Sequence, residues 1–211
     1  MAGSRREFDR ELEAIEAKVA ELFAMIGEDV PVATRALLSG NSEVLPVLAE
    51  REQVIDALYR EIEGLAVRAI LLQAPVASDL RFLLSVLRVV PELERSHDLV
   101  MQIASRAGRI RGEDLSPRSR GLVERTGELA SGMWREAADS WFERDRAAVA
   151  VLGERDEEMG ELHASLTAEL AAGRMTLPVE MTLVARCYER LGAHAVNIAP
   201  RVAYLAGPAA A

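Results

Sequence analysis

Apolar residues recur at intervals of three and four along almost the whole chain, which is the spacing of an amphipathic α-helix. The first segment shows this pattern at Phe8, Leu12, Ile15, Val19, Leu22, Met25 and Ile26. It predicts a long first helix that continues to about Leu38. Pro31 lies inside this helix and is expected to bend it, because proline cannot donate the backbone hydrogen bond that the helix needs there.

Turn and proline signals divide the rest of the first half into two more helices. A Ser-Gly-Asn-Ser sequence predicts a turn, in which Asn41 or Ser42 can cap a second helix. Pro75 is expected to end that helix, since proline disfavours helical geometry in the residue before it. Ser78 and Asp79 then mark the start of a third helix, where a side-chain oxygen can meet free N–H groups.

The helical pattern restarts after a linker that contains Gly, Pro and charged residues, at residues 111–117. Apolar positions with helical spacing predict three further helices, around residues 122–137, 152–170 and 181–205. Pro178 is expected to open the last of them, because proline is favoured in the first turn of a helix.

The two halves also repeat each other in sequence. Residues 50–56, Glu-Arg-Glu-Gln-Val-Ile-Asp, align with residues 154–160, Glu-Arg-Asp-Glu-Glu-Met-Gly. Residues 94–98, Glu-Arg-Ser-His-Asp, align with residues 189–193, Glu-Arg-Leu-Gly-Ala. A repeat of this length indicates a duplicated structural unit whose copies stack and share a core.

Composition agrees with a helical protein. Half of the residues are hydrophobic while aromatic residues make up 4%, so the core must be mainly aliphatic. Few runs of β-branched residues occur, and Ala, Leu, Glu and Arg are abundant, as is typical of helices. We therefore predict an all-α fold of two pseudo-symmetric three-helix bundles, residues 1–111 and 117–206.

Charge and cysteine content limit the function. The net charge of −9 argues against a general nucleic-acid binder and, more weakly, against direct binding to an anionic membrane. Cys187 is the one cysteine, so no intramolecular disulfide can form, and it is interpreted as a packed thiol. No apolar run reaches about 20 residues, and the N-terminal sequence lacks a signal peptide, so a cytoplasmic protein is expected.

Two pairs of carboxylates lie on the second and third predicted helices. Glu52 and Asp56 are four residues apart, as are Glu94 and Asp98, so each pair projects from one side of its helix. If the two helices form an antiparallel hairpin around Pro75, the pairs lie at similar heights and can face each other. The sequence therefore predicts one acidic patch built from both helices.

Four converging carboxylates repel one another unless positive charge lies between them. A divalent or trivalent cation is the natural ligand of such oxygen donors, and Mg, Mn, Fe, Ca and Zn are the candidates. His97 either adds a nitrogen ligand or points away. The alternative interpretation is a solvated helix face in which neighbouring arginines, Arg51 and Arg60 among them, pair with the carboxylates.

The second repeat keeps half of this set. Asp156 and Glu189 retain carboxylates, whereas Gly160 and Ala193 replace the other two. These two residues are weaker candidates for a second metal site.

The remaining candidates for a metal-binding or partner-binding role are interpreted as structural residues. His194 is interpreted as a helix-surface or capping residue in preference to a metal ligand. Trp134 and Trp141 are seven residues apart and share one face of a helix, so they are interpreted as core.

Three segments together resemble a known family. They are residues 73–81 (Gln-Ala-Pro-Val-Ala-Ser-Asp-Leu-Arg), residues 93–98 (Leu-Glu-Arg-Ser-His-Asp) and residues 188–199 (Tyr-Glu-Arg-Leu-Gly-Ala-His-Ala-Val-Asn-Ile-Ala). In combination they are similar to the PhoU family of phosphate-transport accessory and regulatory proteins. The resemblance extends from about Phe8 to Leu205 and includes the duplication.

The resemblance implies a bacterial cytoplasmic protein, not an enzyme, that acts as a negative regulator of phosphate uptake and phosphate-starvation signalling. The implied partners are a phosphate-sensing histidine kinase and the ATPase of a phosphate ABC transporter, so the protein would be peripheral to membrane complexes. Family members often form homodimers. They can bind multinuclear metal clusters through Glu/Asp-x-x-x-Asp motifs, which fall here on Glu52, Asp56, Glu94 and Asp98.

Two other functions stay open. One is a metal-dependent enzyme that acts on phosphate compounds at the Glu52, Asp56, Glu94 and Asp98 cluster. The other is a metal-binding or purely structural helical protein outside phosphate control. The sequence contains neither a Gly-rich phosphate loop nor a His-Glu-x-x-His motif, so we assign no catalytic and no cofactor-binding residue.

Overall fold

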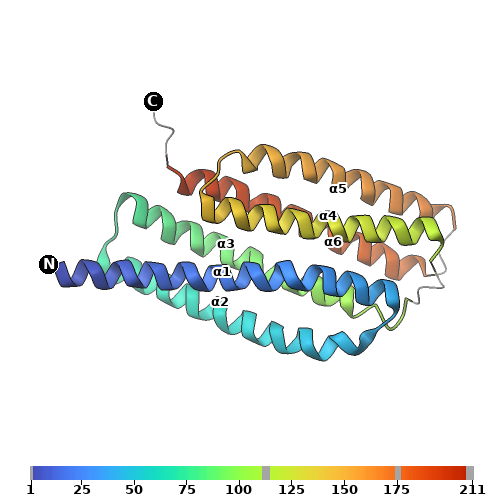
Figure 1. The fold of residues 1–211 in the computed structure, drawn as a ribbon, viewed down its shortest axis with the longest axis horizontal. Helices are drawn as coiled ribbons and strands as arrows, with labels where there is room; N and C mark the ends of the chain where they lie inside the picture. The colour runs from blue at the N-terminus through green and yellow to red at the C-terminus, as the bar shows by residue number, and fades with distance from the viewer. Residues whose placement is uncertain (1, 111–114, 174–176, 208–211) are drawn as a thin grey trace.

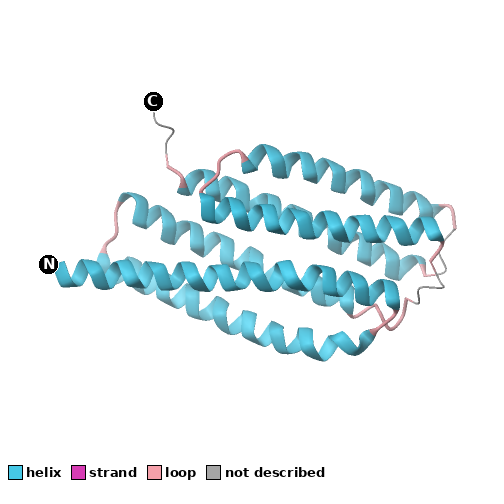
Figure 2. Ribbon diagram, in the orientation of Figure 1, coloured by secondary structure: helices cyan, strands magenta, loops and turns pink. Residues whose placement is uncertain are grey.

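The chain folds into six long α-helices in the computed structural model, which describes residues 2–110, 115–173 and 177–207 (Figure 1). In the first half, α1 (Ala2–Ser39) is followed by a 3₁₀ turn, η1 (Ser42–Val44), and then by α2 (Leu45–Gln73) and α3 (Ala77–Ala104). The second half contains α4 (Pro117–Glu143), α5 (Ala148–Ala171) and α6 (Pro178–Leu205). The described ranges contain no strand (Figure 2), which confirms the all-α prediction.

Asn41, one of the two residues expected to cap the second helix, instead caps a short 3₁₀ turn that precedes it. α1 continues through Pro31 to its end, and the Asn41 side chain then accepts the N–H of Glu43 at 2.8 Å. This bond caps η1, and α2 begins behind it without a side-chain cap. The extra 3₁₀ turn, which the sequence did not reveal, accounts for the difference.

The turn between α2 and α3 forms where Pro75 was expected to end the helix. Ala74 adopts a left-handed conformation there, with φ 44°, and the backbone then reverses direction. Ser78 and Asp79 lie in the first turn of α3, as predicted, but neither side chain caps the helix. Asp79 instead accepts a charged hydrogen bond from Arg5 of α1 at 2.9 Å, which fixes the start of α3 against α1.

The second half opens with a conventional cap. The Ser116 side chain accepts the N–H of Ser119 at 3.1 Å, and Pro117 occupies the first helical position. α6 likewise opens with Pro178, as predicted. Residues 111–114 of the predicted linker lie outside the described residues.

The helices form two three-helix units that lie side by side. α1, α2 and α3 contact one another, as do α4, α5 and α6, and the units meet through α1 against α4 and α3 against α6. α2 and α5 lie on the outer sides of the molecule (Figure 1). The buried apolar residues of both units belong to one continuous core.

Aromatic rings pack against one another across the contact between the units. Trp134 and Trp141 are 1% and 0% exposed, which confirms their interpretation as core. Phe23 of α1 lies 6.3 Å and 6.4 Å from these two rings, and Phe82 of α3 lies 6.4 Å from Trp141. Burying such large rings between the repeats favours their association.

α1 and α4 approach each other closely at Gly127. A Cβ atom at this position would lie 2.4 Å from Thr34 Cγ2, so the contact requires glycine. Thr34 Oγ1 donates to the carbonyl of Val30 at 2.9 Å and therefore accepts the phenolic hydrogen of Tyr188, 2.8 Å away. Burial raises the pKa of Tyr188, which keeps this donor protonated between α1 and α6.

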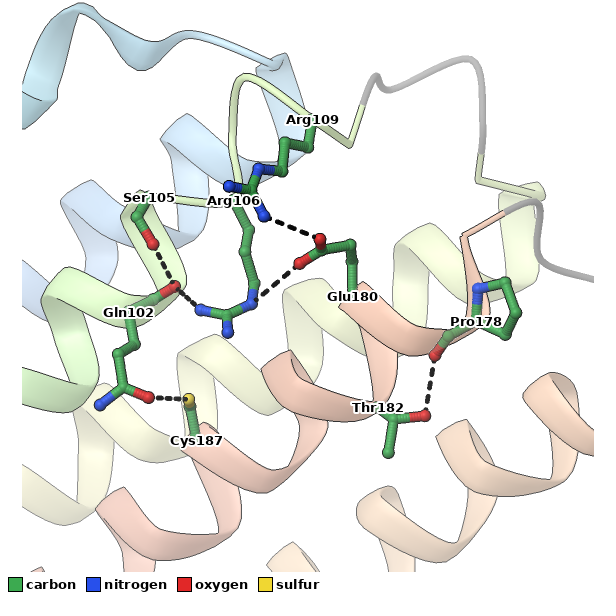
Figure 3. A network of polar contacts seen from close by, with 8 residues as sticks. All are labelled: Gln102, Ser105, Arg106, Arg109, Pro178, Glu180, Thr182 and Cys187. Atoms are coloured by element: carbon green, nitrogen blue, oxygen red, sulfur yellow. Dashed lines mark hydrogen bonds and ion pairs between the residues drawn. The ribbon is translucent and has the colours of Figure 1, made fainter.

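Polar contacts also join α3 to the start of α6 (Figure 3). Arg106 and Arg109 both reach Glu180, with N–O distances of 3.2 Å and 3.0 Å. Close by, the Cys187 thiol lies 3.7 Å from the Gln102 side-chain oxygen. These contacts fix the end of α3 against the first turns of α6.

His194 belongs to the same interface, so its interpretation as a surface or capping residue was wrong. It is 9% exposed, and Nδ1 lies 2.9 Å from Ser96 Oγ. Because the Ser96 hydroxyl donates to the carbonyl of Glu92 at 2.6 Å, His194 Nδ1 is the donor to Ser96. The histidine was misread because its burial depends on α3, which the sequence of α6 alone does not show.

Replacing Gly127 with alanine is expected to destabilise the protein by about 1–3 kcal/mol, since the added methyl group must push α1 and α4 apart. Gly132→Ala in the same helix is the matched control. Nothing lies within 4 Å of a Cβ atom there, so the better helix former should stabilise by about 0.5–1 kcal/mol. Urea unfolding measures both variants, and shifts of equal sign would contradict the close approach.

Stability is expected to fall in mild acid because of His194. Burial is the largest cause that lowers its pKa from the ordinary value, Arg190 and Arg95 add to the effect, and Glu92 opposes it. The unfolded chain therefore binds more protons near pH 6, and the free energy of unfolding rises with pH.

His194→Gln removes this titration and should flatten the pH dependence of unfolding between about pH 5 and 7. His163→Gln, at a more exposed histidine, is the control and should leave that slope in place. Identical slopes in wild type and His194→Gln would refute the assignment.

Candidate functional site

The predicted carboxylate patch lies between α2 and α3, which the turn at Pro75 makes antiparallel. Burial is the largest cause that raises the pKa of Glu94, followed by the negative charges of Asp98 and Asp56. Glu52 adds to the rise, and Arg95 opposes it. Glu94 therefore lies within electrostatic range of the other three carboxylates, Glu52 and Asp56 across the hairpin among them.

This patch is an open surface. Glu52, Asp56 and Glu94 are half-buried and Asp98 is exposed. Asp56 forms an ion pair with Arg60, with 3.1 Å between the guanidinium nitrogen and the carboxylate oxygen. This is one of the arginine contacts expected of a solvated face. Within the described ranges, no three acidic, histidine or cysteine side chains are arranged to hold one ion. The patch thus supplies the oxygen donors that a hard cation prefers, without a closed cage.

A buried charged network lies beside the patch. Asp29 of α1 is 2% exposed, and its carboxylate accepts from Arg51 at 2.7 Å and from His97 Nε2 at 3.2 Å. Arg51 also reaches Glu28 at 2.9 Å. His97 therefore points inward to Asp29, which settles the question that its sequence position left open.

Asp29 is the residue that sequence reasoning missed. Its signal was present, because it lies three residues after Ile26 and one before Val30 on the buried side of α1. A carboxylate at such a position requires partners, since an unpaired buried charge is strongly destabilising. Arg51 and His97 supply them and connect all three helices of the first repeat.

The second repeat has apolar packing at the equivalent place. Met133 and Gly192 occupy the positions of Asp29 and His97 in the aligned repeats. A Cβ atom at Gly192 would lie 3.3 Å from Met159 Cγ and 3.4 Å from the Met133 sulfur, so methionines fill the space of the histidine.

The two carboxylates that this repeat retains lie on the surface. Asp156 and Glu189 are exposed, and Glu189 lies 3.7 Å from His163 Nδ1. The second repeat therefore lacks both the full acidic set and the buried network beside it.

Cys187 does not form a nucleophilic site. The thiol is buried, and burial is the largest cause that raises its pKa, although Arg106 and Arg190 oppose the rise. It therefore stays in the unreactive thiol form at neutral pH, as expected of a packed cysteine. None of the described helices is long and apolar enough to cross a membrane.

Known proteins match the chain across both repeats. A family model described as the PhoU domain matches residues 19–107 and 123–202, once in each three-helix unit. A "Phosphate-specific transport system accessory protein PhoU homolog" from Rhizobium meliloti is 30% identical over 205 residues, covering 94% of this chain and 86% of the relative. The protein of the same name from Zymomonas mobilis is 30% identical over 207 residues, covering 95% and 87%.

Solved structures agree with the sequence matches. The crystal structure of PhoU from Pseudomonas aeruginosa superimposes with a TM-score of 0.87 at 28% identity, covering 94% of this chain and 98% of that chain. The phosphate transport system regulatory protein PhoU from Streptococcus pneumoniae, 23% identical with a TM-score of 0.84, shares the fold. The two matched segments, the duplicated helices and these superpositions together place the chain in the PhoU family.

Proposed function

We propose that this protein is a regulatory accessory protein of a phosphate-specific transport system, which restrains phosphate uptake and phosphate-starvation signalling when phosphate is plentiful. The observation that carries the proposal is the match of both repeats to the PhoU domain over nearly the full length of curated relatives named as transport accessory proteins. The fold contributes a single body with one continuous core, suited to presenting surfaces to partners.

In this proposal the protein acts as an adaptor in the cytoplasm. It binds the ATPase of the phosphate transporter and a sensor histidine kinase, and it changes kinase output by binding one state of the kinase more tightly than the other. No chemical step is needed. The buried, protonated thiol of Cys187 and the open carboxylate patch both fit a protein that is not an enzyme.

A cation site at Glu52, Asp56, Glu94 and Asp98 is the second part of the proposal. It is supported by the raised pKa of Glu94, to which burial contributes most and the charges of Asp98, Asp56 and Glu52 add, because a bound cation would offset that repulsion. Mn²⁺, Fe, Mg²⁺ and Zn²⁺ are the candidate ions, and all accept carboxylate oxygen. The second repeat contributes at most weakly, since Asp156 and Glu189 have lost their partner carboxylates.

Deleting the gene is expected to turn on phosphate-starvation genes in cells that grow in high phosphate. The physical reason is that the kinase then no longer receives the inhibitory contact that reports transporter state. A transcriptional reporter measures the change, and expression of the full-length chain should restore repression. An unchanged reporter in the deletion strain would count against the regulatory role.

Titration calorimetry with Mn²⁺ tests the cation site. Asp98→Asn is expected to weaken binding by about tenfold or more, whereas Asp156→Asn, in the second repeat, should leave the affinity nearly unchanged. In the presence of a chelator, Asp98→Asn should also unfold at a higher temperature than wild type, since it removes one of the repelling charges. Equal loss of affinity in both variants, or no binding by wild type, would contradict the assignment.

A further inference from the structure

The outer face of α1 and α4 contains two crevices that are lined by equivalent positions of the two repeats. The two helices lie side by side on the face that Figure 1 presents to the viewer. One crevice, with a volume of about 320 Å³, lies around Thr34 and Gly127. The other, of about 370 Å³, lies around Phe23 and Ala138, which are the equivalent residues of the opposite repeats. Each crevice can therefore be compared, position by position, with the equivalent crevice of the other repeat.

The two crevices differ in chemistry although equivalent helix segments form them. The first exposes charged residues from α4, and the second has alanine in their place. The equivalent pairs are Glu124 with Ala20, Glu128 with Ala24, and Leu38 with Phe142. We name the second one the apolar crevice. Because its lining residues differ from those of the equivalent crevice, helix packing alone does not explain why they are apolar.

Aromatic residues are concentrated at the apolar crevice. The chain has four phenylalanines and two tryptophans, and three of these, Phe23, Trp134 and Phe142, line this crevice. Phe142 is 40% exposed, and its ring packs edge-on against Phe23 with centroids 6.0 Å apart. Partly exposed aromatic rings above a buried aromatic floor are typical of protein-binding surfaces.

The apolar crevice has room for another backbone. Ala24 is exposed, and a Cβ atom at Gly27 would meet no atom within 4 Å. Small residues along α1 therefore allow a second helix to approach closely, with Phe142 at the end of the crevice. An amphipathic helix that inserts one or two large apolar side chains fits this shape.

The rim of the crevice carries two carboxylates, one of which, Glu28, pairs with Arg51. Glu28 from α1 and Asp139 from α4 flank the crevice, and Asp139 makes no ion pair with the described residues. Arg135 lies where this crevice adjoins its polar twin and lines both. With a net charge of −9 for the whole chain, the partner helix should carry basic residues beside its apolar anchors.

We propose that the apolar crevice between α1 and α4 is the docking site for the phosphate transporter, which seats a basic amphipathic helix of its cytoplasmic part there. This inference rests on the proposed function, because the transporter is the partner that the accessory role requires. It adds the surface that binds and the chemistry of the segment that is bound.

Because the two crevices use equivalent positions, a matched pair of variants is available. Ala24→Glu places the residue of the polar crevice into the apolar one, and Glu128→Ala makes the reverse exchange at the equivalent position. Binding to the intact transporter in nanodiscs is measured by biolayer interferometry. Ala24→Glu should weaken binding by at least about tenfold, while Glu128→Ala should change it by less than about twofold. Both sites are exposed, and urea unfolding checks that each variant is folded.

The outcomes separate this inference from the proposed function. Wild-type binding with no loss in Ala24→Glu overturns the docking site and leaves the accessory role standing. Failure of the wild type to bind the transporter overturns the proposed function, and the docking site with it. A wild-type dimer that Ala24→Glu converts to monomer identifies a second copy of this chain as the occupant, and also overturns the inference.

Salt dependence tests the chemistry of the bound helix. Wild-type affinity should decrease as salt is raised, and Asp139→Asn should reduce that decrease, because an exposed acidic rim attracts a basic partner over a distance that salt screens. Affinity that is independent of salt would overturn the assignment of a basic helix.

Discussion

Trp141 of α4 is buried against rings from two helices of the other repeat, Phe23 of α1 and Phe82 of α3. Neither three-helix unit could keep these rings from water alone, so each unit depends on its contact with the other. The close approach at Gly127 and the bond from Tyr188 to Thr34 complete the same contact. Because this contact fixes α1 and α3, it also fixes the face on which the carboxylates of α2 and α3 meet and the crevices between α1 and α4.

A shared core allows equivalent positions to diverge while the backbone stays in place. Ser96 and His194 form a buried polar pair, and the equivalent residues Leu191 and Leu99 are both buried leucines. Asp29 and His97 are replaced by Met133 and Gly192 in the same way. Each exchange changes both partners together. This is expected, because a buried charge or donor that loses its partner costs more than the complete replacement of the pair.

The sequence predicted what depends on position along one helix, and missed what depends on the pairing of helices. Helical spacing and prolines located the six helices. The turn at Pro75 explains why Glu94 feels the charges of Glu52 and Asp56, whereas a cation site there stays a prediction. The cap at Asn41 was misplaced by one short turn. The burial of His194 and the partners of Asp29 could not be read from α6 or α1 alone, since each partner lies on a helix distant in the sequence. The two crevices could not be predicted from the sequence either, because each is lined by residues of both α1 and α4.

Arg51 lies between the buried network of the first repeat and the outer face of α1. One nitrogen of its guanidinium lies 2.7 Å from the buried Asp29, and another lies 2.9 Å from Glu28 on the rim of the apolar crevice. Its neighbour in α2 is Glu52, a member of the carboxylate patch.

A basic partner beside Glu28 would compete with Arg51 for that carboxylate. A cation beside Glu52 would repel the same arginine, so the two binding events can be coupled through it. In the second repeat the equivalent Arg155 pairs instead with Glu136 and Glu158. The duplication thus retained this arginine in both copies, and in the first copy it links the buried Asp29 to Glu28 on the outer face.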